Sequence, residues 1–351
     1  MNNTLQVYFF SGTGNSKRVT QWICNEAGNL GTESESFDIS KQKPVNFRNE
    51  TTLIFISPTH GFNYPPVVIN YLLRFPKTTF KNKVYLMNTR AGMKLSKIFL
   101  PGFSGIALWF AALILLLKGY RISGMRSIDL PSNWISLHPG LRRKVVDSMF
   151  NHYEKITRDL TDKIIRGRKI FRFSLIIGMP LDIIITPVAI GYYFVGRFVL
   201  AKTFMASSFC DNCGLCIKKC PIQAISLKQN RPYWSYRCES CMRCMNNCPK
   251  RAIETTHGML AAIIFLTYAV VLASFYRWIP INHWKFSNLP FLDSFTKFFI
   301  ESAILFLLLI VTYRLVHFLK RFRWFDYIIV YTSLTKLPFW RRYKSPSLKK
   351  Q

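Results

Sequence analysis

Eight of the nine cysteines in this chain fall into two runs that share one spacing. The runs begin at Cys210 and Cys238, and each reads C-x2-C-x2-C-x3-C-P, so that every position repeats after 28 residues. Four thiolates at this spacing bind a [4Fe-4S] cluster, because the two-residue gaps let one tight loop supply three ligands. The two runs therefore predict two such clusters.

The fourth cysteine of each run lies against a proline and turns away from its own loop toward the other cluster. This exchange predicts two ligand sets. The first set is Cys210, Cys213, Cys216 and Cys248. The second set is Cys238, Cys241, Cys244 and Cys220. Because such clusters are assembled and kept in a reducing compartment, we expect this segment to face the cytoplasm and to carry electrons.

Two zinc sites are the main alternative, since C-x2-C is also a zinc spacing. Tetrahedral zinc takes four ligands, however, and has no use for a third cysteine two residues on or for a proline after the fourth. A disulfide framework does not explain one repeated pattern. The repeat also continues beyond the ligands, where residues 249–253 echo residues 221–225. Over roughly residues 205–256 the chain resembles the two-cluster bacterial ferredoxin domain.

A second candidate site lies near the N-terminus. An apolar run of strand length at residues 5–10 is followed by a loop of small residues at 11–16 and then by a helical stretch. Backbone N–H groups of such a loop point at an anion. The loop has no Walker lysine and does not fit G-x-G-x-x-G, which disfavours ATP and NAD. The predicted phosphate contacts are Ser11, Gly12, Thr13, Gly14, Asn15 and Ser16. A turn that serves packing alone is the alternative.

This loop resembles the FMN-phosphate loop of flavodoxins. Apolar strands at 52–57 and 83–88 follow, and we expect each to end in a loop that grips the flavin ring, as the flavodoxin-like fold implies. The ring contacts implied by the resemblance are His60, Gly61, Phe62, Asn63 and Tyr64 from the first loop, and Asn88, Thr89, Arg90 and Gly92 from the second. Either Phe62 or Tyr64 would stack on the ring. His60 would bond the ring or a backbone carbonyl, and Arg90 would face the flavin or solvent.

The rest of the N-terminal region fits the same fold. Residues 119–130 supply a final strand, and Pro131-Ser-Asn133 resembles a motif that follows it in flavodoxin–ferredoxin fusion proteins. Residues 103–117 are uncharged but short for a membrane span, and we expect a core or membrane-surface helix there. The resemblance to the fusion family covers roughly residues 4–256.

Composition indicates a membrane protein. The chain has 351 residues and a formal net charge of +31, from 48 basic and 17 acidic residues, yet half of its residues are hydrophobic. A soluble nucleic-acid-binding protein can be that basic, but it would not also carry long uncharged runs. We therefore expect basic segments on the cytoplasmic face and no nucleic-acid partner. No signal peptide is expected, since a strand-like run begins at residue 5.

Two C-terminal segments are long enough to cross a membrane. Residues 255–276 contain no Asp, Glu, Lys or Arg, and residues 298–319 are similar in length. The segment between them holds three basic residues, whereas residues 314–351 hold ten basic residues against Asp326 alone. The positive-inside rule therefore predicts an in–out–in hairpin, with the redox domains and the tail in the cytoplasm.

Residues 174–200 are also long and apolar, but they contain Asp182, Pro180 and Pro187. A single crossing here would separate the flavin from the clusters. We therefore expect residues 171–204 to enter the interface and return, as one bent segment or as two short helices in a hairpin, and a buried interdomain helix pair is the alternative. Five preceding basic residues would bind anionic lipid: Lys163, Arg166, Arg168, Lys169 and Arg172.

The predicted fold class is an α/β flavodoxin-like doubly wound parallel sheet, with a small α+β ferredoxin domain and a transmembrane helical hairpin. The predicted domains are a flavodoxin-like FMN-binding domain at 1–166, a hydrophobic membrane-interface connector at 167–204, a two-[4Fe-4S] ferredoxin domain at 205–256, the transmembrane hairpin at 257–320 and a basic-aromatic cytoplasmic tail at 321–351.

Together these features predict an electron-transfer protein of the cytoplasmic membrane that relays electrons between FMN and two [4Fe-4S] clusters, with a redox partner protein. No paired-carboxylate or Ser/His/Asp pattern indicates hydrolysis, so an enzymatic activity would be that of an oxidoreductase. One alternative is a ferredoxin-like subunit of a larger membrane redox complex, whose flavodoxin fold is a docking scaffold without flavin. A quinone-linked reductase is another alternative, but two helices form a poor enclosure for a quinone.

Overall fold

The computed structural model describes residues 4–41, 51–278 and 290–343. The last eight residues of the predicted tail lie outside this description. The chain divides into two compact units. Unit 1 comprises Met1–Tyr193, Cys241–Asn246 and Arg341–Gln351, and unit 2 comprises Phe194–Ser240 and Asn247–Trp340.

Unit 1 contains a mainly parallel sheet with the strand order β2-β1-β3-β4-β6. Its strands are β1 (Leu5–Phe9), β2 (Ser34–Asp38), β3 (Thr52–Pro58), β4 (Lys83–Leu95) and β6 (Arg121–Pro131), and a short β5 (Ile98–Leu100) pairs antiparallel with the end of β4. This is the strand order of the flavodoxin-like doubly wound fold, as the sequence predicts. The inner strands β1 and β3 are apolar because helices cover both of their faces.

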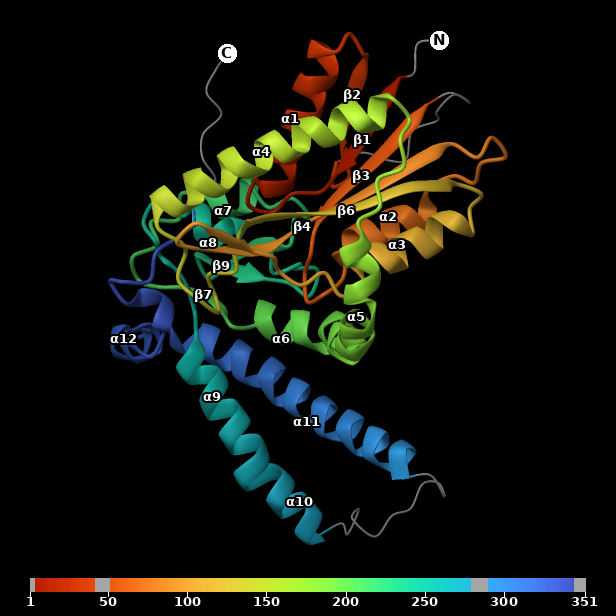
Figure 1. Ribbon diagram of the computed structural model, residues 1–351. Coiled ribbons are helices and arrows are strands. Elements are labelled where there is room, and N and C mark those ends of the chain that lie inside the picture. Colours follow the sequence, from red (N-terminus) through yellow and green to blue (C-terminus); the bar gives the residue numbers. More distant parts are fainter. Residues whose placement is uncertain (1–3, 42–50, 279–289, 344–351) are drawn as a thin grey trace. The chain divides into compact units, whose positions relative to one another are not determined.

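The helices of unit 1 cover both faces of this sheet. Figure 1 shows α1 (Asn15–Asn29) and α4 (Arg143–Ile165) on one face and α2 (Pro66–Arg74) and α3 (Ala107–Leu116) on the other. The predicted apolar helix is α3, which buries Leu108 and Leu115 against the sheet. The doubly wound architecture therefore explains an apolar segment that is too short to cross a membrane.

One expected loop is a strand. The sequence predicts that β4 ends at Asn88, but the strand continues to Leu95. The reason is that β6 is almost as long as β4, and its backbone pairs with β4 as far as Gly92. The following residues then pair with β5. Thr89, Arg90 and Gly92 thus stand on a strand, not in a loop.

Residues 173–201 form one uninterrupted helical stretch. It consists of α5 (Phe173–Gly191), a π-helical segment η1 (Tyr192–Gly196) and α6 (Arg197–Ala201). The expectation of two short helices in a hairpin is therefore wrong, because no non-helical turn separates them. The part Leu175–Ala201 is long and apolar enough to cross a membrane.

Unit 2 contains two small antiparallel strand pairs. β7 (Phe204–Ala206) pairs with β10 (Ile253–Thr255), and β8 (Ile225–Lys228) pairs with β9 (Arg231–Trp234). A short helix lies within each cysteine run, namely α7 (Leu215–Lys218) and α8 (Arg243–Asn247), of which most of α8 belongs to unit 1. The sequence repeat is thus also a repeat of secondary structure.

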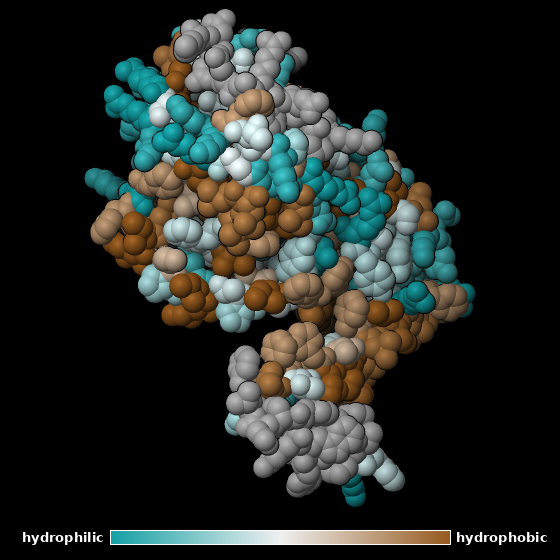
Figure 2. Space-filling view, turned by 90° about the vertical axis from the view of Figure 1, so that its right-hand side faces the viewer, coloured by the Kyte–Doolittle hydropathy of each residue, from teal (hydrophilic) through white to brown (hydrophobic). Residues whose placement is uncertain are grey.

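A helical hairpin follows in unit 2. Its first arm is α9 (His257–Leu266), the π-helical η2 (Thr267–Leu272) and α10 (Ala273–Trp278), and its second arm is α11 (Pro290–Leu319), as Figure 1 shows. The stretches His257–Trp278 and Leu292–Leu319 are each long and apolar enough to cross a membrane. Figure 2 shows hydrophobic side chains over the visible face of the hairpin. Phe265 and Leu307 are 69% and 61% exposed, which suits contact with lipid.

The base of the hairpin shares a core with the ferredoxin region. Met205 of β7, Ile263 of α9, Tyr313 of α11 and Ile329 of α12 (Arg323–Tyr331) belong to one buried cluster. The backbone N–H of Trp234 donates to the Tyr313 hydroxyl at 3.2 Å. A short 3-10 helix, η4 (Leu334–Lys336), ends the region. Apolar burial therefore joins the cysteine-bearing segment to both candidate spans.

Candidate functional site

Four cysteines from both runs line one pocket in unit 2. They are Cys210, Cys213, Cys216 and Cys248, the first predicted ligand set. Apolar side chains of Ile217, Leu227 and Ile253 complete the wall. No three His, Cys, Asp or Glu residues in the described part of the chain are grouped to hold a single metal ion. A pocket lined by four thiols and apolar groups fits an iron–sulfur cluster.

The thiols of this pocket influence one another. Burial, together with the neighbouring Cys210 and Cys248, raises the pKa of Cys216 to about 11. The thiolate form that binds iron is therefore costly in the bare pocket and needs the positive charge of the metal. None of the nine cysteines, all of which lie in the described ranges, is in a disulfide, so no disulfide competes with ligation.

The two fourth cysteines have equivalent surroundings. The backbone N–H of Ala224 donates to Cys220 Sγ at 3.2 Å, and that of Ala252 donates to Cys248 Sγ at 3.3 Å. Hydrogen bonds to cluster sulfurs are one means by which a protein sets the reduction potential. In the second predicted set, Cys220 and Cys238 belong to unit 2, whereas Cys241 and Cys244 belong to unit 1.

The predicted phosphate loop leads into the N-terminus of α1. Gly14 precedes the helix with φ 112°, a left-handed conformation that side chains rarely adopt. Its backbone N–H donates to Ser11 Oγ at 3.1 Å, and Ser16 Oγ shares a hydrogen bond with Thr89 Oγ1 at 2.9 Å. No side chain in the described part of the chain caps this end of α1, and its first turn has no acidic residue. The positive end of the helix dipole therefore faces the loop, which fits a phosphate.

A segment of the second cysteine run contacts the same loop within unit 1. Arg243 Nη2 donates to the carbonyl oxygen of Ser11 at 2.8 Å, and its Nε donates to that of Gly12. A Cβ atom added to Gly12 would lie 2.7 Å from Cys241 Cβ. Arg243 thus brings a positive charge to a loop that has none of its own, and only glycine fits at position 12.

Sequence reasoning missed Arg243, although the repeat carries a signal. Its counterpart 28 residues earlier is the apolar Leu215, so the two runs differ here in charge. Reasoning also missed Tyr343, whose hydroxyl donates to Asn15 Oδ1 at 2.5 Å. Asn133, from the motif after β6, donates to Thr13 Oγ1. Residues that are so far apart in the sequence leave no local sequence pattern that would predict their contact.

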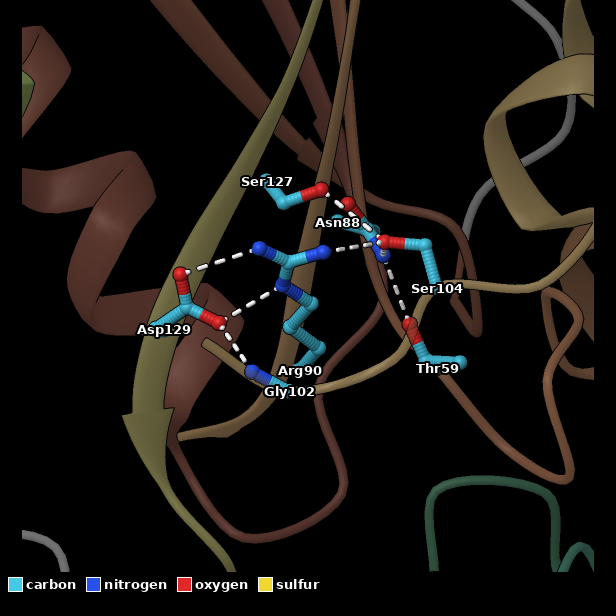
Figure 3. A network of polar contacts seen from close by, with 7 residues as sticks. All are labelled: Thr59, Asn88, Arg90, Gly102, Ser104, Ser127 and Asp129. Carbon is cyan, nitrogen blue, oxygen red and sulfur yellow. Dashed lines mark hydrogen bonds and ion pairs between the residues drawn. The ribbon is translucent and has the colours of Figure 1, made fainter. Parts of the chain in front are cut away.

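Several predicted ring contacts have other partners. Tyr64 is 1% exposed and donates to the carbonyl oxygen of Met87 at 2.8 Å, as a core residue does. Asn88 donates to Thr59 Oγ1 at 2.8 Å and to Ser104 Oγ at 3.1 Å. Figure 3 shows these bonds beside the ion pair of Arg90 with Asp129, which is 2.6 Å long. Asn88 and Arg90 therefore hold the strand ends together.

The loop after β3 keeps an aromatic residue near its surface. Phe62 is half-buried, with φ 65°, and His60 and Asn63 pair through their backbones at 2.8 and 3.2 Å. A Cβ atom on Gly61 would lie 2.1 Å from the ring of Tyr192. That ring meets Trp134 edge-on, with centroids 5.8 Å apart. Tyr192 and Trp134 thus lie near this loop in addition to its own Phe62, and neither of the two is predicted from sequence.

Comparisons with known proteins give one family match and several similar solved structures. Residues 209–253 match the 4Fe-4S dicluster domain. No curated protein matches the chain. Solved structures similar to part of this chain include a flavodoxin from Streptococcus pneumonia TIGR4, with 12% identity over 44% of this chain and 99% of that chain and a TM-score of 0.30. A flavodoxin from the domain Archaea has 11% identity over 46% and 98%, and a TM-score of 0.30. The general stress protein 14 from Treponema denticola, in complex with FMN, has 9% identity over 46% and 98%, also with a TM-score of 0.30.

Proposed function

We propose that this chain, in which a 4Fe-4S domain accompanies a flavodoxin-like sheet, is a membrane-anchored protein that relays electrons between FMN and two [4Fe-4S] clusters at the cytoplasmic face. Bound FMN accepts or gives two electrons and passes them singly, whereas each cluster carries one electron at a time. The protein would therefore connect a two-electron donor or acceptor with a one-electron redox partner protein.

The observation that carries the proposal is the contact of Arg243 with the phosphate loop. Arg243 directly precedes Cys244, a predicted ligand of the second cluster, and it binds the carbonyl oxygens of Ser11 and Gly12. Cys241, another predicted ligand, packs against Gly12. A flavin phosphate held at the start of α1 would thus share one structural unit with two ligands of a cluster, which supports electron exchange over a short path.

Membrane anchoring rests on the hairpin, because both arms are long and apolar enough to cross. An in–out–in path keeps the ferredoxin region and the basic tail on the cytoplasmic side. We infer that the stretch Leu175–Ala201 lies along the membrane surface and does not cross it, because a third crossing would separate the two redox domains. In support, Trp109 Nε1 of α3 donates to Asp182 Oδ2 at 3.2 Å, which ties α5 to the flavodoxin-like domain.

The test is to purify the full chain in detergent under argon and to measure iron and flavin. Two full clusters require about eight irons per chain, and fewer than about six would refute the two-cluster form. An absence of bound flavin would refute the relay. A redox titration followed by EPR and visible absorbance would then count the centres and order their potentials.

A second function is favoured by one observation, the engagement of Asn88 and Arg90 with neighbouring side chains. In that case the flavodoxin-like domain would be a docking scaffold without flavin in a larger membrane redox complex. The two functions differ in a simple readout. The scaffold would hold iron but no flavin, and it would be isolated together with other subunits.

A further inference from the structure

A cavity of about 330 Å³ lies in unit 1 between β4, the middle of β6, residues 101–104 and the first turns of α5. None of the phosphate-loop residues 11–16 lines it, so it is separate from the predicted flavin phosphate site. Its strand side is polar, with Arg90, Arg126 and Ser127. Its helix side is largely apolar, with Leu175 and Leu181. The cavity is therefore amphipathic.

One of the three cavity arginines is already neutralised. Arg90 binds both carboxylate oxygens of Asp129, at 2.6 and 3.2 Å, and its Nη1 donates to Ser104 Oγ at 3.1 Å. Figure 3 shows this arrangement, with the backbone N–H of Gly102 also donating to Asp129 at 2.8 Å. The pair is nearly buried and has fixed geometry. Arg90 therefore lines the cavity, but its charge is already balanced by Asp129.

The charges of Arg126 and Arg172 are not compensated in this way. Neither forms an ion pair with a carboxylate in the described ranges 4–41, 51–278 and 290–343. Arg126 Nε is buried and has no hydrogen-bond partner among those residues. Burial, followed by repulsion from Arg172, lowers the pKa of Arg126. Arg126 is half-buried, its Nε has no hydrogen-bond partner among the described residues, and Arg172 lies beside it, so an anion bound in the cavity would stabilise its charge.

The beginning of α5 adds to the positive potential. Arg172 precedes the helix, no described side chain caps it, and its first turn contains no acidic residue. The one acidic side chain that lines the cavity, Asp182, accepts the indole N–H of Trp109 at 3.2 Å. Backbone N–H groups, two guanidinium groups and serine hydroxyls match the oxygens of a phosphate group.

The outer surface of α5 indicates where such a ligand comes from. Ile176, Ile177 and Ile184 are 63%, 66% and 71% exposed, and Phe103 at the cavity wall is 56% exposed. A polar cavity beneath an apolar helix suits a molecule with an anionic head and hydrocarbon chains. We infer that this cavity binds the phosphate group of an anionic phospholipid, whose acyl chains lie along α5. This inference rests on the proposed membrane association of α5.

The experiment measures binding of fluorescent phosphatidylglycerol to the full-length protein in a neutral detergent. The test variants are Arg126→Gln and Arg172→Gln. The matched control is Arg121→Gln, because Arg121 is exposed on the same strand and does not line the cavity. We expect each test variant to weaken binding at least about tenfold and the control to leave it unchanged. Labelled phosphatidylcholine, which carries no net charge, should bind weakly to all four proteins.

A stability measurement separates a binding role from a structural one. In lipid-free detergent, Arg126→Gln should unfold at the same or a higher temperature than the parent protein, since it removes a poorly solvated charge. Added phosphatidylglycerol should then stabilise the parent but not the variant. If Arg126 is only structural, the variant unfolds earlier and lipid stabilises both proteins equally, which overturns the inference.

Two further outcomes also overturn it. If inorganic phosphate displaces the lipid at an equal concentration, the site recognises a soluble anion and not a lipid headgroup. If Arg126→Gln lowers the flavin content while iron is retained, the cavity is part of the flavin site. Failure of the proposed relay is distinguishable, because it appears in the iron and flavin content of the parent protein and not in lipid binding.

Discussion

The guanidinium group of Arg243 donates a hydrogen bond to the backbone carbonyl oxygen of Ser11, with 2.8 Å between the two atoms. Ser11 opens the loop that would hold a flavin phosphate, and Arg243 lies between two predicted cluster ligands. The positively charged guanidinium holds the loop and also raises the local positive potential. Flavin binding should therefore depend on this contact between the second cysteine run and the loop.

Replacing Arg243 should weaken flavin binding without removing iron. Arg243→Ala deletes charge-assisted hydrogen bonds to the loop, and we expect flavin affinity to fall about tenfold or more. Arg243 is not a ligand, so the iron content should stay the same. Arg237→Ala is the control, because Arg237 is an exposed residue near the same cysteine run. Equal flavin affinity in both variants would contradict the role given to Arg243.

Gly14, directly before α1, and Gly28, near the end of α1, should respond oppositely to substitution by alanine. Gly14 has φ 112°, where a side chain costs at least about 1 kcal/mol, so Gly14→Ala should lose flavin absorbance. Gly28 lies near the other end of the helix with nothing within 4 Å of an added Cβ. Gly28→Ala should keep flavin and stabilise the helix slightly. The measurement is the visible spectrum per mole of protein, and retained flavin in Gly14→Ala would contradict the phosphate site.

The ligand exchange between the cysteine runs predicts which variants resemble each other. Cys248→Ser and Cys213→Ser should impair the same cluster and give the same residual EPR spectrum, since both side chains line one pocket. Cys220→Ser should impair the other cluster. Cys24→Ser is the control, because Cys24 lies in α1, belongs to neither cysteine run and is half-buried, which raises the pKa of its thiol. If Cys248→Ser matched Cys241→Ser instead, each run would bind its own cluster.

A buried ion pair should stabilise the ferredoxin region. Lys320 Nζ lies 3.1 Å from Asp326 Oδ1, and the side chains are 5% and 2% exposed. Asp326 also accepts the backbone N–H of Ser208 at 2.8 Å, two residues before the predicted ligand Cys210. Asp326→Asn would leave the lysine charge uncompensated in a buried site, so we expect a loss of about 3–5 kcal/mol.

Bleaching of cluster absorbance in denaturant measures this loss. The control is Asp159→Asn, which breaks an exposed pair with Lys163 and should cost less than about 1 kcal/mol. The double variant Lys320→Met with Asp326→Leu should recover much of the loss, because it removes both buried charges. An unchanged midpoint in Asp326→Asn would show that the pair does not support the fold.

Elements with a local signal were predictable. The cysteine spacing is local, because three ligands of a cluster come from one short loop, and the family match over residues 209–253 agrees with it. The apolar runs that became β1, β3 and β4 were also recognised, since a strand covered on both faces must be apolar throughout. The strand β2 was missed, because S-E-S-F-D lies at the sheet edge and needs no apolar run.

The sequence alone determined which chemistry the chain can support, because ligand type, ligand spacing and hydrophobic length are properties of short segments. The tertiary structure decided which distant residues meet. It directed Arg90 to Asp129, brought Arg243 to Ser11, and closed a basic cavity with α5. These contacts join residues tens to hundreds of positions apart, and their formation depends on how the sheet and helices pack, which no local pattern encodes.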